Sequence, residues 1–580
     1  MSNQSDGYGD NYWLRRAGSN RLSRRRFVAA AGAVSASVAF SAACGSKTRK
    51  TTGGASATTV APPTVTTGKA VPGASEQPKR GGTFTFAEGG SPRTLDPHFD
   101  TFPANTIVTN NVYNSLLTFT PDLTKIVPEL ATALPEQPDP LSFVFKLQQG
   151  VKYQNVAPAN GREMTSADVK YSIERQMTNQ AGKFQHAYFF LNKLASIETP
   201  DKYTIKFTTM KPYAPFISYM ASPWTQVILR ELVEADGDLT KRAVGTGPFI
   251  FDEWQKDVQI KLHRNPDYWR KDAMGGQLPY IDNLVINLAT DANAIQALFV
   301  NGDVMAAGIQ FTFTDQVQKK VPKANYRIQP SQFWREMRTP PWDGVKYMQR
   351  KPYDDIRVRQ AVVQAVNKKE VLDTVLSGDG VLVNGPIIPV YTTWALKEDP
   401  AKFDIADAKK LLEAAGQGSG YDEEMIFASD NAGDIASQVG EVLKAQLAKI
   451  GVRVTLRPMD TASYYNKTYS YDYTLSHHIP LNNPDPDENL SSYFGQNGTF
   501  YKWGNKDIWA MIDQQSQTLD QTARQQIVQD VQRKIVLDYP MAFIYAPNNH
   551  FFTSSKVKGW FFANDLYNGR LEPVWLDPSA

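Results

Sequence analysis

Carboxylates and histidines are the residues of this sequence that could support acid–base or metal chemistry. Three carboxylates stand together in Asp485-Pro486-Asp487-Glu488, and His477 and His478 are adjacent. Neighbouring residues on a strand point to opposite faces, so the two histidines make a poor bidentate metal site. No motif holds a pair of these acids at the separation that hydrolysis requires. We therefore expect no metal and no cofactor.

Motifs that would indicate an enzyme are missing. The sequence has no GxxxxGK[ST] phosphate loop, no HExxH zinc pair, no GxSxG elbow and no CxxC. It has one cysteine in 580 residues, which excludes a disulfide scaffold. No stretch approaches 18 consecutive apolar residues, which excludes a polytopic membrane protein. We expect a protein that is not an enzyme.

The first 43 residues have the pattern of an export signal. Arg24, Arg25 and Arg26 precede Phe27 and a weakly apolar stretch rich in Ala, Gly and Ser. The pair Arg24-Arg25 resembles the twin-arginine signal, with an ordinary secretory signal as the alternative. The stretch ends in Ser41-Ala42-Ala43-Cys44, which resembles a lipobox. We expect lipidation of Cys44, with simple cleavage and a free thiol as the alternative.

Residues 44–80 follow as a tether between this anchor and a folded body. They are rich in Thr, Gly, Ala, Ser and Pro and have almost no large apolar side chains, so they cannot form a core. Signal, anchor and tether together predict an exported protein at the outer face of the cytoplasmic membrane.

The net charge of +3 belongs to the first 43 residues, because residues 44–580 hold 56 basic and 57 acidic side chains. This balance gives no reason to expect nucleic acid.

The body from about residue 81 alternates strand and helix patterns, which predicts an α/β fold. The segments 83–87, 203–208 and 258–263 alternate with period two and are predicted strands. Thr165 and Asp291 are predicted helix caps, and valines from Val362 to Val375 predict one long helix.

A series of sequence blocks in this body resembles the extracellular solute-binding proteins of family 5, the peptide- and nickel-type receptors of ABC importers. The blocks run collinearly over about residues 81–580, and no single block is specific by itself. They are GGTFTFAEGGSPRTLDP from Gly81, VYNSL from Val112, VPELAT from Val127, FKLQQGVKYQN from Phe145, MTSADVKYSIER from Met164, GTGPFIFDEW from Gly245, RNPDYW from Arg264, DDIRVRQAVVQAVNKKEV from Asp354 and DPDENL from Asp485.

The resemblance implies a two-lobed periplasmic-binding-protein clamshell of type II, with an extra small domain, mixed sheets and several hinge crossings. Ligand in the cleft would contact both lobes and favour closure, without chemistry on the ligand. The domains it implies are 1–43 as signal peptide, 44–80 as tether, 81–124, 194–290 and 546–580 as the first lobe, 125–193 as the inserted small domain and 291–545 as the second lobe.

The resemblance also implies where a ligand would bind. Peptide-binding members have an Asp three residues before the Asp-Pro pair, and it binds the α-ammonium group of the peptide; here Asn482 stands there, beside Asp485. An amide loses the charge-assisted bond, so a free peptide N-terminus would be held less tightly unless Asp485 substitutes. The other predicted contacts are Ile479 and Thr461, where aromatic residues are usual, and Trp334, Arg335, Arg338, Tyr464 and Tyr465. Arg338 could meet a ligand carboxylate, and Trp334 could stack on a ligand or pack in the core.

These inferences predict a lipid-anchored, monomeric receptor that captures an oligopeptide or peptide-like solute for an ABC permease with its cytoplasmic ATPase. A second possibility is the same fold binding an oligosaccharide or a metal chelate. From another functional class, a secreted hydrolase would need a preorganised pair of acids, and a sensory receptor would bind without supporting uptake.

Overall fold

The computed structural model describes residues 77–99, 103–178, 186–342, 350–429, 433–480, 484–498, 500–560 and 569–580. The chain forms two compact units, of which one comprises 70–179 and 184–580. The other, 1–69 and 180–183, lies entirely outside the described residues. The predicted signal peptide with Arg24 and Arg25, the lipidation site Cys44 and residues 44–76 of the tether therefore lie outside the described part as well.

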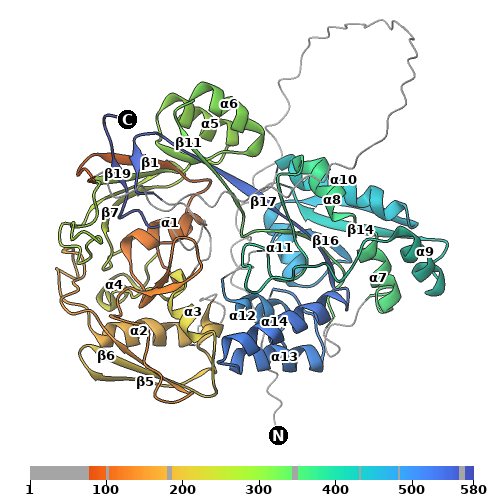
Figure 1. Cartoon of the computed structure of the whole chain (residues 1–580), viewed down its shortest axis with the longest axis horizontal. Coiled ribbons are helices and arrows are strands. Elements are labelled where there is room, and N and C mark those ends of the chain that lie inside the picture. The colour runs from red at the N-terminus through yellow and green to blue at the C-terminus, as the bar shows by residue number, and fades with distance from the viewer. Residues whose placement is uncertain are drawn as a thin grey trace, which may run out of the picture. The chain divides into compact units, whose positions relative to one another are not determined.

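Twelve strands of the described part form one large mixed sheet (Figure 1). Along its main path the order is β15-β14-β16-β12-β17-β10-β1-β9-β8-β7, and β11 and β13 pair with β17. The strands are β1 (Thr83–Ala87), β7 (Phe249–Gln255), β8 (Gln259–Arg264), β9 (Asn283–Asn287), β10 (Ala306–Gly308), β11 (Asn325–Pro330), β12 (Arg335–Arg338), β13 (Gly380–Leu382), β14 (Tyr421–Ala428), β15 (Val452–Met459), β16 (Leu475–His478) and β17 (Met541–Thr553).

Three smaller sheets accompany it in the described residues. They pair β2 with β3, order β4-β6-β5, and pair β18 with β19. Their strands are β2 (Leu117–Phe119), β3 (Ile126–Pro128), β4 (Ser142–Lys146), β5 (Leu194–Asp201), β6 (Thr204–Thr209), β18 (Val557–Lys558) and β19 (Trp575–Leu576).

Helices lie around these sheets (Figure 1). The α-helices are α1 (Pro103–Val112), α2 (Ser166–Met177), α3 (Phe216–Met220), α4 (Arg230–Asp236), α5 (Ala292–Asn301), α6 (Thr314–Lys320), α7 (Ile356–Gln364), α8 (Lys368–Leu376), α9 (Ile405–Ala414), α10 (Gly433–Ala448), α11 (Thr461–Tyr469), α12 (Pro486–Asn489), α13 (Lys506–Gln517) and α14 (Gln521–Val536). Short 3₁₀ turns η2 (Ala187–Phe189), η3 (Pro223–Thr225) and η4 (Phe311–Phe313) and a π-turn η5 (Leu490–Phe494) connect them.

Local sequence signals set several of these boundaries. The predicted strand 83–87 is β1, and Thr165 and Asp291 precede α2 and α5 as predicted. The valine stripe predicted one long helix, which is wrong: it spans α7 and α8. Asn367 interrupts it, since its side chain accepts a hydrogen bond from the backbone of Glu370 and caps a new helix.

Two large hydrophobic cores divide the described unit. The first includes Phe84, Phe143 and Trp224, and the second includes Met337 and Val362. We call the elements around the first core the first lobe and those around the second core the second lobe. The sheet β4-β6-β5 and α2 pack on the first core, so strands on both sides of the predicted boundary at 193 share one sheet.

The long strand β17 belongs to both lobes. Its first half pairs with β12 and β13 of the second lobe, and its second half pairs with β10 and β11. Because β10 also pairs with β1, residues after 291 enter the sheet of the first lobe, before the chain reaches the second. A strand shared in this way is a natural hinge.

Among the described residues, each helix is too short or too polar to span a lipid bilayer.

Candidate functional site

The acidic run at 485–488 lies where the two lobes meet. Asp485 caps α12, since its carboxylate accepts a hydrogen bond of 2.9 Å from the backbone N–H of Asp487. Pro486 takes the first helical position, where no N–H is needed. The local sequence therefore starts a short helix here, and this helix carries Asp487 and Glu488.

Both acids of α12 contact the first lobe. The hydroxyl of Tyr219, on α3, donates to Oδ2 of Asp487 at 2.7 Å. Nε2 of His186 lies 3.1 Å from Oε1 of Glu488. All four side chains are buried, and α3 and α12 lie side by side in Figure 1. We call these two contacts the latch.

Asp487 is held by donors from its own lobe as well. Gln515 Nε2 donates to Oδ1 at 2.5 Å, and the Ser491 hydroxyl donates to the same oxygen at 2.8 Å. Burial and the neighbouring charge of Asp485 raise the pKa of Asp487, while the hydrogen bond from Tyr219 opposes this. A carboxylate with three such donors is committed to structure, so it is a poor candidate for an acid catalyst.

Asp485 forms an ion pair with Arg524 on α14. Two nitrogens of the guanidinium donate to its two oxygens at 2.6 and 3.0 Å, and both side chains are buried. Both residues also border a cavity of about 590 Å³ between the lobes, which is lined among others by Phe119, Ile126, Tyr213, Trp394, Asp485 and Arg524. Asp485 as a ligand contact stays a prediction, and Arg524 already balances its charge.

Helix α11 places tyrosines on two different faces. Tyr464 is buried, and its hydroxyl lies 2.9 Å from the carbonyl oxygen of His477 and 2.7 Å from Nδ1 of His478. Tyr465 and Tyr469 are one turn apart and stack at 5.5 Å, with Tyr469 40% exposed. The helix therefore buries the predicted site residue Tyr464, leaves Tyr465 half-buried and exposes Tyr469.

Tyr465 and Tyr469 continue into a larger group of rings. Phe500 lies 6.5 Å from Tyr469 and 5.4 Å from Tyr493, measured between ring centroids. We call Tyr465, Tyr469, Tyr493 and Phe500 the aromatic wall. Rings at these separations gain from packing on one another; Tyr469 is exposed, Tyr465 and Phe500 are half-buried and Tyr493 is buried.

Trp334, Glu336 and Arg338 form a buried network behind this wall. Glu336 accepts from Nε1 of Trp334 at 3.0 Å and from Nε of Arg338 at 2.5 Å, and the Arg338 guanidinium lies 5.5 Å from the ring of Tyr493. Burial raises the pKa of Glu336, and the charge of Arg338 opposes this. Glu336 and Arg338 are 0% and 1% exposed, so their charges balance within the lobe. Trp334 and Arg338 as ligand contacts stay predictions.

Both adjacent histidines are buried on β16. His478 bonds to Tyr464, whereas neither ring nitrogen of His477 has a hydrogen-bond partner. Burial, together with the charge of Arg335, lowers the pKa of His477 to about 3. Within the described ranges, no group of three His, Cys, Asp or Glu residues could hold a metal ion.

The remaining predicted contacts lie close to these elements. Thr461 is the first residue of α11, behind the capping residue Asp460. Ile479 follows β16 and is half-buried. Asn482 lies outside the described residues. The sequence analysis did not single out Tyr469 and Phe500; the spacing of Tyr465 and Tyr469, four residues apart, was the signal for a shared helical face.

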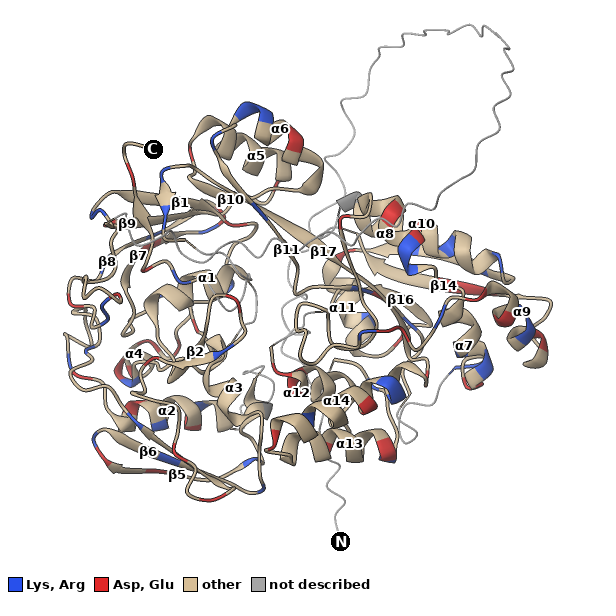
Figure 2. Cartoon of the chain, viewed as in Figure 1, with Lys and Arg blue, Asp and Glu red and all other residues tan. Residues whose placement is uncertain are grey.

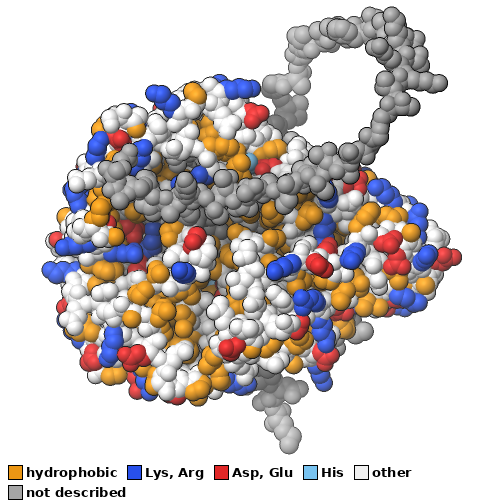
Figure 3. Space-filling model, in the orientation of Figure 1, with side chains coloured by type: hydrophobic (Ala, Val, Ile, Leu, Met, Phe, Trp, Pro, Cys, Tyr) orange, Lys and Arg blue, Asp and Glu red, His pale blue; other side chains and the backbone are white. Residues whose placement is uncertain are grey.

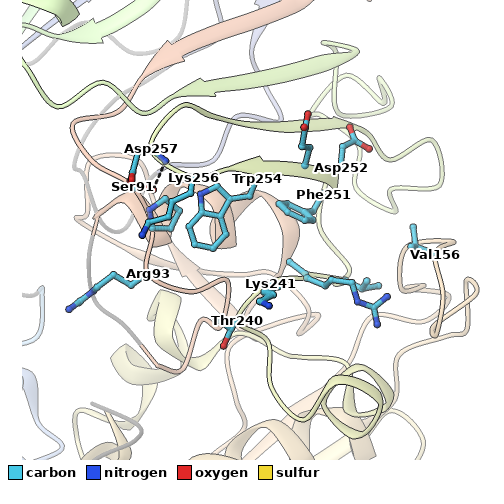
Figure 4. Close-up of a pocket in the computed structure, with 15 residues that line it drawn as sticks. Ser91, Arg93, Val156, Thr240, Lys241, Phe251, Asp252, Trp254, Lys256 and Asp257 are labelled. Atoms are coloured by element: carbon cyan, nitrogen blue, oxygen red, sulfur yellow. Dashed lines mark hydrogen bonds between the residues drawn. The ribbon is translucent and has the colours of Figure 1, made fainter. Parts of the chain in front are cut away.

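The first lobe has a larger cavity of about 1040 Å³ (Figure 4). The rings of Trp254 and Phe251 lie at its centre in Figure 4, and the residues that line it all come from positions 91–257. Among its charges, Asp252 pairs with His263 at 2.6 Å. A ligand held by one lobe would not favour closure, so this cavity is the weaker candidate for a receptor site.

Charge elsewhere is evenly distributed. Basic and acidic residues are interspersed over both lobes in Figure 2, and the face in Figure 3 mixes them with hydrophobic side chains.

Relatives and solved structures share this architecture. The chain is 28% identical over 492 residues to "Di/tripeptide-binding protein 1" of Pseudomonas aeruginosa, covering 79% of this chain and 87% of that protein. The periplasmic binding protein DppA of Helicobacter pylori, solved with the peptide STSA, matches with a TM-score of 0.73 and 25% identity over 86% of this chain and 98% of that one. AgaA of A. tumefaciens R10, solved with agropinic acid, matches with a TM-score of 0.71 and 24% identity over 86% and 99%.

These solved neighbours confirm the predicted type II periplasmic-binding-protein fold, and in this chain the two lobes share the strand β17. The family model described as "Bacterial extracellular solute-binding proteins, family 5 Middle" matches residues 125–501, which is more than half of the chain. The chain thus belongs to the family 5 bacterial extracellular solute-binding proteins, as its sequence blocks predicted.

Proposed function

We propose that this protein captures an oligopeptide or peptide-like solute between its lobes and delivers it to the permease of an ABC importer. The observation that carries the proposal is the double connection of the lobes: they share β17, and the latch joins them through α12. The relatives named above, a di/tripeptide-binding protein and a receptor solved with the peptide STSA, support a peptide as the solute.

Capture would work by a shift between open and closed forms. A solute that contacts both lobes binds the closed form more tightly, and its binding energy draws the latch together. The aromatic wall offers stacking faces for apolar groups of different shape, which suits solutes with variable side chains. The permease would then recognise the closed form.

This role includes no chemical step on the solute. The acids at the lobe contact are engaged, Asp485 with Arg524 and Asp487 with Tyr219 and Gln515. A hydrolase would need two acids that are free to exchange protons with a substrate. We propose that the protein is a monomeric receptor without enzymatic activity.

Its place is the outer face of the cytoplasmic membrane. The twin arginines Arg24 and Arg25 would direct export, and lipidated Cys44 would anchor the folded body through the tether. The Cys44→Ala variant is then expected in the soluble fraction after cell lysis, while the wild type pellets with membranes. Equal pelleting of the two would contradict the anchor and leave the receptor role untouched.

Native mass spectrometry of the protein purified from its own producing cell tests the solute class. A receptor with slow dissociation retains its ligand through gentle purification. A ladder of peptide masses is the expected result. A single sugar or chelate would overturn the peptide assignment, and turnover of a bound peptide would overturn the receptor role.

A further inference from the structure

One arginine at the hinge has no counter-charge. Arg335, at the start of β12, has no acidic residue within ion-pair distance among the described residues, and its Nε is buried without a hydrogen-bond partner. Arg335 is half-buried, and the buried arginines of the described residues differ from it: Arg175, Arg338 and Arg524 each have a carboxylate oxygen at 2.5 to 2.6 Å, and Arg359 has one at 3.4 Å. Removing an unbalanced charge from water is unfavourable, so an anion bound beside Arg335 would stabilise the protein.

Arg335 borders a cavity of about 270 Å³ beside β17. Residues of both lobes line it: Phe551 belongs to the first core, and Leu376 from α8 and Tyr545 from β17 belong to the second. Gln310 also lines it, and its exposed side-chain amide makes no hydrogen bond within the described part. The cavity therefore has room for a small ligand, and its lining offers a guanidinium and an amide as donors.

The acid that borders the same cavity is already engaged. Asp379 accepts from Nδ2 of Asn548 at 2.7 Å and lies 2.5 Å from Nε2 of His550, whose Nδ1 lies 2.6 Å from the hydroxyl of Tyr326. This chain of bonds is complete without Arg335. Asp379 is thus fixed by the hinge strands and does not neutralise the arginine.

Arg335 also acts on the second lobe beyond the cavity. Burial lowers its pKa, opposed by the phenols of Tyr545 and of Tyr465, and the latter belongs to the aromatic wall. Its charge in turn lowers the pKa of His477 and His478.

We propose that this hinge cavity is an anion site, in which Arg335 binds a carboxylate. The carboxylate comes either from a small free anion or from the captured solute; only the second source depends on the proposed function. A bound anion would contact elements of both lobes beside the strand about which they move. It would favour the form in which these elements are close.

Thermal unfolding of the full chain with acetate, and with acetamide as its uncharged analogue, tests the site. A ligand at ten times its Kd raises the ratio of folded to unfolded protein about elevenfold. Acetate is expected to raise the Tm of the wild type in a saturable manner, at constant ionic strength, and acetamide is not. Arg335→Gln should abolish the difference, and Arg457→Gln, which removes an exposed arginine, should keep it.

Arg335→Lys covers the case in which the glutamine variant does not fold, because a lysine keeps the charge and should respond to acetate with lower affinity. An equal response to acetate and acetamide in the wild type overturns the proposal, and so does an undiminished acetate response in Arg335→Gln. Neither measurement uses a solute, so failure here is distinguishable from failure of the receptor role.

A bound peptide then identifies the source of the carboxylate. If the solute supplies it, a saturating peptide acid removes the acetate response, and the C-terminal amide of the same peptide does not. If a free anion supplies it, the response persists with both peptides. Loss of the response with both forms overturns the proposal, because the effect of acetate would then follow general closure and not Arg335.

Discussion

Replacing Tyr219 with phenylalanine tests whether the latch belongs to the closed form. The substitution removes one hydroxyl and keeps the ring, which stacks on Phe189 at 3.6 Å. The lost bond is a 2.7 Å donation to the buried carboxylate of Asp487. Hydrogen bonds to charged groups contribute about 1.5–3 kcal/mol. In an open form, water would replace the hydroxyl, so most of this loss would fall on the closed form.

The expected result is weaker solute binding. If the bond forms only on closure, the loss of about 1.5 kcal/mol or more raises Kd by roughly tenfold or more. Isothermal titration calorimetry with the peptide identified by mass spectrometry measures this change directly. The free energy of unfolding without solute should change little.

Tyr203→Phe is the matched control. Tyr203 donates to Glu163 at 2.8 Å within the first lobe, so its loss touches no contact between the lobes. Its Kd should equal that of the wild type. An unchanged Kd for Tyr219→Phe, together with a fall in the free energy of unfolding, would refute the reasoning: the contact would then exist in the open form as well.

Three further predictions concern the second lobe. Glu336→Gln leaves Arg338 buried without its counter-charge and should destabilise the protein by about 3–5 kcal/mol in urea unfolding. His477 has a pKa of about 3 in the folded protein, so below its ordinary value near 6.5 only the unfolded chain takes up the proton. The contribution of the neutral, buried His477 to the free energy of unfolding is therefore complete above about pH 6.5 and decreases as pH falls, by about 2 kcal/mol between pH 7 and pH 5. His477→Asn should reduce this loss of stability. Tyr469→Ala removes an exposed ring that stacks on Tyr465 and should weaken solute binding by roughly tenfold, with a smaller effect on stability.

Each of these has a result that contradicts it. Glu424→Gln removes an exposed acid paired with Arg457 and should change stability by less than about 1 kcal/mol; an equal effect of Glu336→Gln would mean that water reaches Arg338. If His477→Asn loses as much stability between pH 7 and pH 5 as the wild type, that loss belongs to other groups. A Tyr469→Ala variant with wild-type Kd would remove the aromatic wall from the site.

Several features were predictable from the sequence because their causes are local. A capping residue fixes a helix start from its own side chain, as at Asp291, where the Asp291 carboxylate accepts from the backbone of Ala294 at 2.8 Å. The block that begins at Gly245 could be recognised from the sequence although its cause is tertiary: a Cβ on Gly245 would lie 2.2 Å from the carbonyl oxygen of Val112, so packing requires glycine there. Such blocks, in order, identified the family and its fold.

The strand partners within each lobe could not be predicted, because sheets are assembled from segments that are distant in the sequence. No sequence pattern in residues 292–308 indicates that β10 pairs with β1, which lies more than 200 positions earlier. Pairing depends on which edge is free after the rest of the sheet has formed, and an isolated strand carries no record of its partner.

The site divides in the same way. The sequence by itself determined the acidic run at 485, the aromatic content of α11 and the helix start at Asp485. Only the tertiary structure decided what these residues touch. Tyr219 and Asp487 are 268 positions apart, and Arg338 is neutralised by Glu336 while Arg335, on the same strand, has no carboxylate beside it. Residue type sets what a side chain can do, but burial and the distance to a partner decide which charges are already balanced and which still require a ligand.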